Sequence, residues 1–419
     1  MNMQEEILED VLASIDGSAL NPSVKCGIDE FTIVLQPAQR VPIDMWVAEA
    51  QNIMQDFLEL SQIEELLGKL EVTSHKLVQG YNCGFTLNQP YYLCICFNSE
   101  LEAMGVCCRF SAYAWASYQE KYHEKYGKEI DLSIFLRMVQ SDTYSQRLSR
   151  VDLTVDFFNM PNPLQQGVYL SPDTIYNCLI KGQMVVVDHQ GRSNIKKFSA
   201  INNQGEYETC YVGSRKGNTS GFLRIYDKKL EQEQTHGFRY ADAIQTKSWI
   251  RFEAVYKNPY SHQIGDALLD IYTESDYESF IASKILDKYI FKFPATDEVT
   301  FFSELLMMVA SGKEFDSLEC TSPRDNSLMQ SLKYLGSNSG LFITLEKIQR
   351  LYPQQKSVEK VLEWLQEMFE KYYEEKISRV ENHEVDKWLM KHRETTQKQS
   401  LDDILEAVEM EMLYSGEWR

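Results

Sequence analysis

The sequence predicts an α+β fold, in which a mostly antiparallel sheet built from two similar halves precedes a helical C-terminal domain. Apolar and polar residues alternate in several short segments, as in Ser149–Asp156 and Ser248–Tyr256, and such alternation is typical of half-buried strands. Both halves open with a strand that carries an aspartate, Asp29 or Asp152, which indicates an internal duplication. From about Leu268 the pattern becomes helical, acidic and rich in methionine.

A chain of 419 residues is long enough for two or three domains, and its 43% hydrophobic content allows substantial cores. We expect three segments: an acidic leader (1–22), a sheet domain (23–265, with halves of about 23–140 and 141–265) and a helical domain (266–419). The net charge of −20 weakens a simple nucleic-acid-binding interpretation. However, residues 144–258 contain 15 Lys and Arg against 11 Asp and Glu, so a mildly basic middle lies between acidic ends.

The N-terminal segment 1–19 is acidic and has neither the basic flank nor the apolar centre of a signal peptide. The longest apolar stretch, near Phe301–Ala310, is interrupted by polar residues and is too short to span a bilayer. The nine cysteines show no paired CxxC spacing, and Cys94-Ile-Cys96 and Cys107-Cys108 are typical of reduced core residues. The sequence therefore predicts a cytoplasmic protein without a membrane span.

In the first half, the strand Ile28–Leu35 ends at Pro37, and Ile43–Leu60 places apolar residues at helical spacing. Ser111 can cap the helix that follows it, which is expected to run to about Tyr126. Three further strands and a short helix complete this half: near Lys76–Phe85, Tyr91–Phe97, Gly105–Phe110 and Leu132–Val139.

In the second half, Ser171 followed by Pro172 is a typical helix start, and a short helix is expected over Tyr240–Thr246. The strands of this half are Ser149–Asp156, Val185–Val187, Tyr207–Val212, Gly221–Asp227 and Ser248–Tyr256. In the C-terminal domain the clearest helix is Ser357–Arg379, whose aromatic stripe we interpret as core packing.

A second internal echo relates Val106–Ser111 to Phe222–Tyr226, because each is a short apolar strand that carries an arginine and runs into polar sequence. If the duplication is genuine, Ser111 stands where the second half has Tyr226. Only the second half would then carry a reactive phenol.

The segment Tyr211–Glu231 contains two short strands joined by a turn rich in glycine and serine. Side chains alternate across a strand, so the second strand should place four side chains on one face: Phe222, Arg224, Tyr226 and Lys228. A phenol between two cations makes a poor core but a good phosphate site, because Arg and Lys both bind phosphate oxygens.

Two other strands add acidic groups to this arrangement. Asp152 and Asp156 share one face of the first strand with Arg150, and Glu253 shares a face of the other with Arg251. Pairing the three strands would gather carboxylates, cations and one tyrosine on a single sheet surface. That combination suits metal-assisted attack on a phosphodiester.

These strands resemble the replication initiation factor family, the tyrosine nickases of rolling-circle plasmids and conjugative transposons. The resembling segments are Arg150–Asp156, Tyr211–Arg215 running on to Arg224–Lys229, Trp249–Glu253 and, as the family's opening strand, Ile28–Ile33. Together they span roughly Cys26–Lys257, and their order and spacing are specific. No motif of the C-terminal domain contributes.

The resemblance implies that Tyr226 is the nucleophile, which attacks one phosphodiester at an origin, remains joined to the 5′-phosphate and frees a 3′-OH. It also implies a divalent metal held by carboxylates. Asp152 and Glu253 are the first choices as ligands, and Asp156 and Asp29 come second, without a ranking between them.

The chemistry of the residues agrees with that role. A phenol with a pKa near 10 is a weak nucleophile at pH 7, so Tyr226 needs activation. Arg224 and Lys228 can hold non-bridging oxygens while a hard cation polarises the phosphate. The seven histidines include no His-apolar-His pair, so a carboxylate site favours Mg²⁺ or Mn²⁺ over Zn²⁺.

We expect DNA contacts from Arg150, Arg251 and the turn Ser214-Arg215-Lys216, whose backbone N–H groups can face an anion. Other interpretations remain open at this stage. The turn is equally compatible with a solvated loop, Asp152 with an ion pair to Arg150 or Arg251, and Tyr226 with half-buried packing.

The leading interpretation is therefore a metal-dependent DNA nicking-joining enzyme of a mobile element, which acts at a double-stranded origin with a single-stranded nick region. The alternative is a catalytically inactive protein that binds origin or single-stranded DNA as a repressor or scaffold. The residues do not separate a plasmid initiator from a conjugative relaxase. The helical C-terminal domain points to a helicase, a transfer-complex protein or a second copy of the chain as partner.

Overall fold

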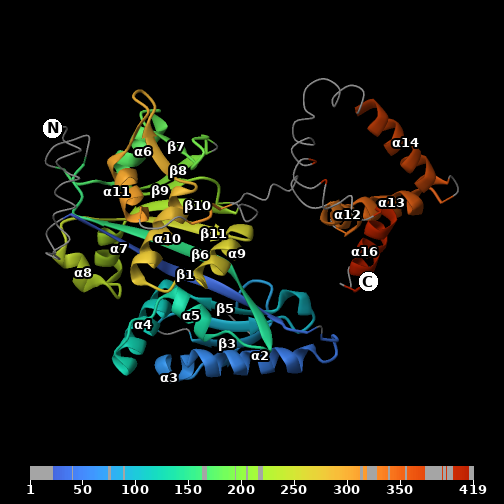
Figure 1. Cartoon of the computed structure of the whole chain (residues 1–419), viewed down its shortest axis with the longest axis horizontal. Helices are drawn as coiled ribbons and strands as arrows, with labels where there is room; N and C mark the ends of the chain where they lie inside the picture. Colours follow the sequence, from blue (N-terminus) through green and yellow to red (C-terminus); the bar gives the residue numbers. More distant parts are fainter. Residues whose placement is uncertain are drawn as a thin grey trace. The chain divides into compact units, whose positions relative to one another are not determined.

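The structure is a computed structural model of the whole chain, shown in Figure 1. It describes the following residues: 22–39, 41–73, 77–87, 90–162, 168–193, 195–203, 206–215, 220–311, 315–318, 328–337, 340–353, 356–372, 389, 393 and 400–414. The predicted leader 1–22 therefore lies outside the described residues, apart from its last residue. The chain forms two compact units, 1–319 and 320–419, each of which is described by itself.

The first unit contains a ten-stranded sheet in the order β2-β3-β4-β5-β1-β6-β11-β10-β9-β8, in which all neighbours are antiparallel. The strands are β1 (Ser23–Pro37), β2 (Glu71–Thr73), β3 (Cys83–Leu87), β4 (Leu93–Phe97), β5 (Val106–Phe110), β6 (Tyr144–Phe158), β8 (Phe198–Asn203), β9 (Glu206–Val212), β10 (Gly221–Asp227) and β11 (Trp249–Lys257). The predicted strand near Lys76–Phe85 is wrong in its position, since β2 ends before it and β3 begins at Cys83.

The sheet is built from two similar halves. The 15-residue strands β1 and β6 pair at its centre, and Figure 1 shows them side by side through the first unit. Outward from β1 the order is β5, β4, β3, β2, and outward from β6 it is β11, β10, β9, β8. In both halves the long strand is followed by a helix, a meander and a last strand that returns to pair with it. The predicted fold class and its duplication are thus confirmed.

The topology corrects the predicted correspondence between the halves. β5 and β11 both pair with the central strand of their half, whereas β4 and β10 both lie one strand further out. Tyr226 on β10 therefore corresponds to a position on β4, and not to Ser111, which follows β5 and caps a helix through a hydrogen bond from the Ala114 N–H.

Helices and a small second sheet complete the first unit. The helices are α2 (Trp46–Ser61), α3 (Ile63–Leu67), a 3₁₀ turn (Glu102–Met104), α4 (Ala112–Tyr126), α5 (Leu132–Met138), α6 (Pro172–Ile180), α7 (Lys228–Thr235), α8 (Tyr240–Gln245), α9 (Pro259–Leu268), α10 (Glu274–Leu286) and α11 (Phe301–Ala310). The second sheet has the order β13 (Glu298–Val299), β12 (Ile290–Phe293), β7 (Val185–Val187). Ser111 and Ser171 cap their helices as predicted, because each hydroxyl accepts a backbone N–H three residues later.

One face of the large sheet packs on the core and the other carries the charged groups. On the core face Phe31 stacks on Phe110 with ring centroids 4.8 Å apart, and Trp115 of α4 meets Phe31 edge-on at 5.0 Å. Because paired residues share a face, the core-facing residues of β6 leave Asp152 and Asp156 on the opposite face.

The helices α9 to α11 pack on the sheet of the first unit, whereas the predicted boundary at 265 falls within α9 and assigns α10 and α11 to the C-terminal domain. Ser261 of α9 donates a hydrogen bond of 2.9 Å to the Leu148 carbonyl of β6. Phe302 of α11 meets Phe252 of β11 with ring centroids 5.4 Å apart. The first unit consequently extends about fifty residues beyond the predicted boundary at 265, to Glu319.

In the second unit the described residues form the helices α12 (Leu328–Ser337), α13 (Leu341–Leu351), α14 (Ser357–Tyr372) and α16 (Leu401–Tyr414). The sequence predicts that the apolar stripe of α14 packs in a core. Among the described residues this prediction is wrong, since Trp364 is 54% and Phe369 62% exposed. Within the described residues no helix is long and apolar enough to cross a membrane.

Candidate active site

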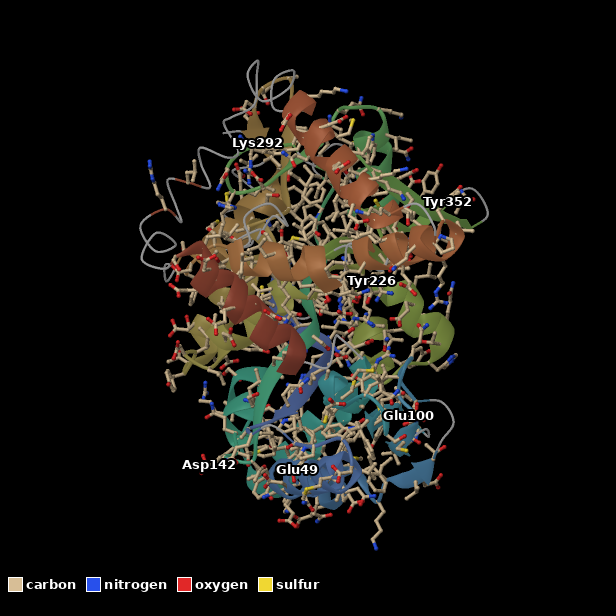
Figure 2. All side chains as sticks on the ribbon, turned by 90° about the vertical axis from the view of Figure 1, so that its right-hand side faces the viewer. Glu49, Glu100, Asp142, Tyr226, Lys292 and Tyr352 are labelled. Carbon is tan, nitrogen blue, oxygen red and sulfur yellow. The ribbon has the colours of Figure 1, made fainter. Side chains whose placement is uncertain are left out.

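Tyr226 lies near the end of β10, on the charged face of the sheet, and is labelled in Figure 2. Its hydroxyl donates a hydrogen bond of 3.1 Å to Glu253 Oε2, and Arg224 Nη2 donates to the same oxygen at 2.6 Å. The Arg224 guanidinium also lies 4.6 Å from the centre of the Tyr226 ring. The predicted phenol, carboxylate and guanidinium are therefore in direct contact.

The strand register explains this contact. β10 and β11 are antiparallel, and Arg224 pairs with Glu253 while Tyr226 pairs with Arg251. Side chains of paired residues and of residues two apart lie on the same face, so the four side chains converge. They come from β10 and β11, which are separated in the sequence by the helices α7 and α8.

Lys228 reaches the site in a different way from the one predicted. The strand ends at Asp227, whose side chain caps α7 by accepting the Leu230 N–H at 2.9 Å, and Lys228 is the first residue of that helix. Its ammonium still lies 5.6 Å from the Tyr226 ring centre and forms an ion pair of 2.8 Å with Glu231. The side chain is buried, so Lys228 covers the ring rather than extending the strand face.

The Tyr226 side chain is itself almost buried, at 7% exposure. Burial, followed by the negative charge of Glu253, raises the pKa of its hydroxyl well above the ordinary value. At neutral pH the hydroxyl is therefore protonated and donates its proton toward Glu253. That geometry makes Glu253 the group best placed to accept the proton if the phenol attacks.

Asp152 lies beside this cluster and is also buried. Arg150 binds it through two hydrogen bonds, from Nε at 2.9 Å and from Nη2 at 2.7 Å. Burial raises the pKa of Asp152 above its usual range, and the negative charge of Glu253 raises it further. Asp152 and Glu253 are thus close enough to repel each other. The sequence analysis left open an ion pair between Asp152 and Arg150, and the structure contains it.

Asp156 and Asp29, the second choices as metal ligands, are joined by Arg251. The Arg251 guanidinium donates to both oxygens of Asp156 at 2.7 and 2.8 Å and to Asp29 at 2.8 Å. Although burial opposes ionisation, the positive charge of Arg251 holds the pKa of Asp156 below its usual range. Arg251 is itself buried, so its predicted contact with DNA competes with this bonding.

The other predicted DNA contacts are only partly described. Arg215 is exposed, and its guanidinium lies 4.2 Å from the centre of the Tyr211 ring on β9. Ser214 precedes it in the same turn, and Lys216 lies outside the described residues. Arg150 is partly exposed and lies next to Asp152. These residues remain predicted DNA contacts.

Within the described part of the chain, no group of three or more His, Cys, Asp or Glu residues is arranged to hold a metal ion. Asp152 and Glu253 offer carboxylate oxygens, the ligand type through which Mg²⁺ is commonly bound, and Arg150 and Arg224 occupy these carboxylates in the structure. The donor set contains only oxygen and does not suit Zn²⁺.

Sequence reasoning missed three charged residues near the site. Glu30 of β1 accepts hydrogen bonds from Arg109 of β5 and Arg150 of β6, at 2.9 and 2.8 Å. Arg239 lies between α7 and α8 and binds Asp156 at 3.3 Å, with its guanidinium 4.3 Å from the Trp249 ring centre. The pairing of distant strands brings Glu30 and Arg109 to the site, and the connection between α7 and α8 brings Arg239 there, so no local pattern could have identified these residues.

A cavity of about 630 Å³ adjoins the Arg251 cluster. Asp29, Asp156, Arg239 and Arg251 line one part of it, together with Phe238. Tyr226 and Glu253 are not among its lining residues. The cavity therefore borders the candidate active site without containing the phenol.

The family model described as "Replication initiation factor" matches residues 146–303 of this chain. The resemblance inferred from the strands is therefore confirmed over the second half of the sheet and the helices that follow it. A search of curated proteins gives no match. Among solved structures, the chain is similar to a rolling circle replication initiator protein from Geobacillus stearothermophilus, with 14% identity and a TM-score of 0.46; the match covers 69% of this chain and 97% of the other.

Proposed function

Because the segment 146–303 matches the replication initiation factor family, we propose that this chain starts DNA replication or transfer by nicking and rejoining one strand at an origin. The observation that carries the proposal is the contact of Tyr226 with Glu253 and Arg224. A nucleophile, a proton acceptor and a cation for the phosphate meet within the matched segment. The DNA partner is an origin, with a duplex site and a single-stranded nick region.

In the proposed reaction, the Tyr226 oxygen attacks the phosphorus of one phosphodiester, and its proton passes to Glu253 Oε2. The bond between phosphorus and the 3′-oxygen breaks, and that oxygen leaves as a 3′-OH after it takes up a proton. The 5′-phosphate stays joined to Tyr226. The new phosphotyrosine bond keeps the energy of the broken linkage, so a later 3′-OH can reverse the step without ATP.

Arg224 supplies positive charge beside the attacking oxygen, where negative charge develops on the phosphate. Lys228 lies 5.6 Å from the centre of the same ring and adds a second cation. Asp152 and Glu253 are the residues that would hold a divalent cation, Mg²⁺ or Mn²⁺. When bound, such an ion would polarise the phosphate and favour the ionised phenol.

The test is a nicking assay on supercoiled plasmids that carry segments of DNA from around the gene, with Mg²⁺ or with EDTA. We expect a nicked product in Mg²⁺ that carries protein at its 5′ end, and none in EDTA. Tyr226→Phe should abolish the adduct while DNA binding persists, because only the hydroxyl is lost.

A matched control is Tyr211→Phe, since Tyr211 lies one strand away on β9 and pairs with Arg224. It should nick as the wild type does. An adduct that persists in Tyr226→Phe would remove Tyr226 from the proposed role. A nick that forms equally well in EDTA would exclude a requirement for a divalent metal ion.

The burial of Tyr226 favours a second candidate function, a protein that binds origin or single-stranded DNA as a repressor or scaffold without cutting it. In that case a buried phenol held by Glu253 would be structural. Such a protein would bind the same DNA but leave every supercoiled substrate uncut, with or without Mg²⁺. The assay above separates the two functions directly.

We further propose that the exposed stripe of α14 contacts a partner, either a helicase or transfer-complex protein or a second copy of the chain. Trp364, Met368 and Phe369 expose apolar surface along this helix. Sedimentation of the full chain alone and with a purified helicase of the same host tests both partners. Trp364→Glu should weaken whichever association is found, and no association in either case would count against the proposal.

A further inference from the structure

Three arginines form a row on the charged face of the sheet: Arg109 on β5, Arg150 on β6 and Arg224 on β10. Their side chains are 35%, 29% and 37% exposed. Each is paired with a carboxylate that lies deeper in the sheet surface. The acids Glu30, Asp152 and Glu253 are only 17%, 2% and 3% exposed, so the cations form an outer layer over buried anions.

The row is continuous with Tyr226. Glu30 joins Arg109 to Arg150, and Arg150 in turn binds Asp152. Asp152 lies near Glu253, which binds both Arg224 and Tyr226. The chain of contacts thus leads from the first half of the sheet to the proposed nucleophile in the second.

The spacing of the row suits a polymer of phosphates. Four strand steps separate β5 from β10 in the order β5-β1-β6-β11-β10, and neighbouring strands lie about 4.8 Å apart. The arginines therefore extend about 20 Å across the sheet, which is the length of a few nucleotides of single strand. Arg109 and Arg150 are in register on either side of Thr32, whereas Arg224 pairs with Glu253 and lies four residues further along the strands than Lys257, the partner of Arg150.

The arginines remain able to bind a further anion. A guanidinium has five N–H donors, and pairing with a buried carboxylate fixes its plane without using all of them. Among the described residues, the buried Nε of Arg224 has no hydrogen-bond partner. Aromatic rings also flank the row, since Arg109 lies 5.5 Å from the centre of the Tyr92 ring and Arg224 lies beside Tyr226.

We propose that Arg109 and Arg150 hold the backbone of the single strand that continues from the phosphate at Tyr226, so that the first half of the sheet is its binding half. This inference rests on the proposed function for the identity of the strand. The charge of the outer layer, its continuity with Tyr226 and its length favour single-stranded DNA over a compact anion.

The experiment measures binding of a fluorescent 20-nucleotide oligo-dT to the full chain at several salt concentrations. Each lost phosphate contact reduces the slope of log K against log salt by about 0.7 for a single strand. Arg109→Gln should therefore weaken binding at low salt by at least about fivefold and reduce the slope by about 0.7. Arg109→Lys, which keeps the charge, should retain the wild-type slope.

Two further variants separate phosphate binding from a structural role. Glu30→Gln removes the anion that competes for Arg109 and Arg150, so it should strengthen oligo-dT binding. If the arginines only anchored Glu30, this variant would leave binding unchanged or weaken it. Arg192→Gln is the matched control, because Arg192 is likewise paired with a mostly buried acid, Asp188, but belongs to the turn after β7. It should change neither the affinity nor the slope.

An Arg109→Gln variant with wild-type affinity and slope would overturn the inference. So would displacement of oligo-dT by poly-glutamate of equal charge, which would indicate a general surface for acidic polymers. Because oligo-dT binding needs no cleavage, the binding proposal and the nicking proposal are tested independently. If no substrate is nicked but Arg109→Gln still weakens oligo-dT binding as expected, the binding proposal holds and the nicking proposal fails. If nicking occurs but Arg109→Gln leaves oligo-dT binding unchanged, the nicking proposal holds and the binding proposal fails.

Discussion

The two halves of the sheet carry different chemistry on the same arrangement of strands. In the second half, the pair β10–β11 presents Tyr226 and Glu253 on the charged face. In the first half, the corresponding pair β4–β5 presents three thiols on that face, Cys94, Cys96 and Cys107, with Cys96 directly opposite Cys107. The frame is duplicated, but the ionisable cluster is not.

The surroundings of the two clusters differ as much as their residues. Leu77, Val78, Tyr81 and Tyr92 pack over the thiols, which form a small apolar cluster separate from the main core. The Tyr226 cluster is instead joined through ion pairs to partly exposed arginines. The comparison shows that the two halves share a strand topology but carry different side chains on it, so the topology alone does not determine the chemistry of either half.

The largest effect that separates the halves should come from their glutamates. Glu253→Gln should lower the nicking rate by about 10²- to 10⁴-fold, because the proton acceptor of Tyr226 is lost. The same change in the first half, Glu30→Gln, should alter the rate by less than about tenfold, since among the described residues Glu30 forms its ion pairs with Arg109 and Arg150 and not with Tyr226. The readout is the single-turnover rate of nicking on one supercoiled substrate. Equal nicking rates for the two variants would contradict the proposal that only the second half carries the catalytic glutamate.

The second effect concerns stability. Arg251 is buried and donates hydrogen bonds to both Asp156 and Asp29, so Arg251→Met should remove the cation that these two carboxylates share and leave Arg239, 3.3 Å from Asp156, as a weaker partner. We expect this loss to cost about 3–5 kcal/mol. Arg192→Met removes a pair whose arginine is 55% exposed and should cost about 1 kcal/mol or less. Urea unfolding measures both. A similar small loss for the two variants would indicate that the Arg251 cluster is hydrated and not structural.

Alternation along single strands predicted which side chains share a face in the candidate site, and the resemblance to a known family suggested their roles. The alternation predicts that Arg224 and Tyr226 share one face of β10 and that Glu253 lies on one face of β11. The register of the two strands then brings the three side chains together. Local signals also identified the caps Ser111 and Ser171. Such features depend on residues close in sequence, and for that reason they can be read from the sequence alone.

The ion pairs between distant strands could not be predicted in the same way. Arg251 and Asp29 are 222 residues apart, and their contact requires β1, β6 and β11 to be neighbours. A register shift in β1 between Ile28 and Phe31 sets how the strand pairs there, which alternation alone did not reveal. Lys228 was misplaced because Asp227 ends the strand and caps a helix at that point.

A smaller effect follows from the raised pKa of Asp152. Above about pH 4 the unfolded chain ionises this carboxyl freely, whereas the folded chain must ionise it in a buried site beside Glu253. The folded state therefore binds more protons, and this group lowers the free energy of unfolding as pH rises from about 4 toward its folded pKa. Asp152→Asn removes the dependence.

Urea unfolding in EDTA at pH 4.5 and pH 7.5 checks this sign. The stability of Asp152→Asn relative to the wild type should be greater at the higher pH. Asparagine keeps a neutral polar group of nearly the same shape beside Arg150 at both pH values, so the difference between them isolates the ionisation of the Asp152 carboxyl. No difference, or one of opposite sign, would show that Asp152 is hydrated in the folded protein.

The smallest effect should come from the thiols of the first half. Cys96→Ala removes one sulfur from a buried apolar cluster, which should cost about 1 kcal/mol in urea unfolding. It should leave the nicking rate and the salt slope of oligo-dT binding unchanged, because Cys96 lies outside the row that links Arg109 to Tyr226. A matched change in the second half, Cys210→Ala on β9, removes a sulfur that is equally buried and should behave alike. A loss of nicking in Cys96→Ala alone would mean that the thiol cluster supports the reaction, and that the two halves are less separate in function than their residues indicate.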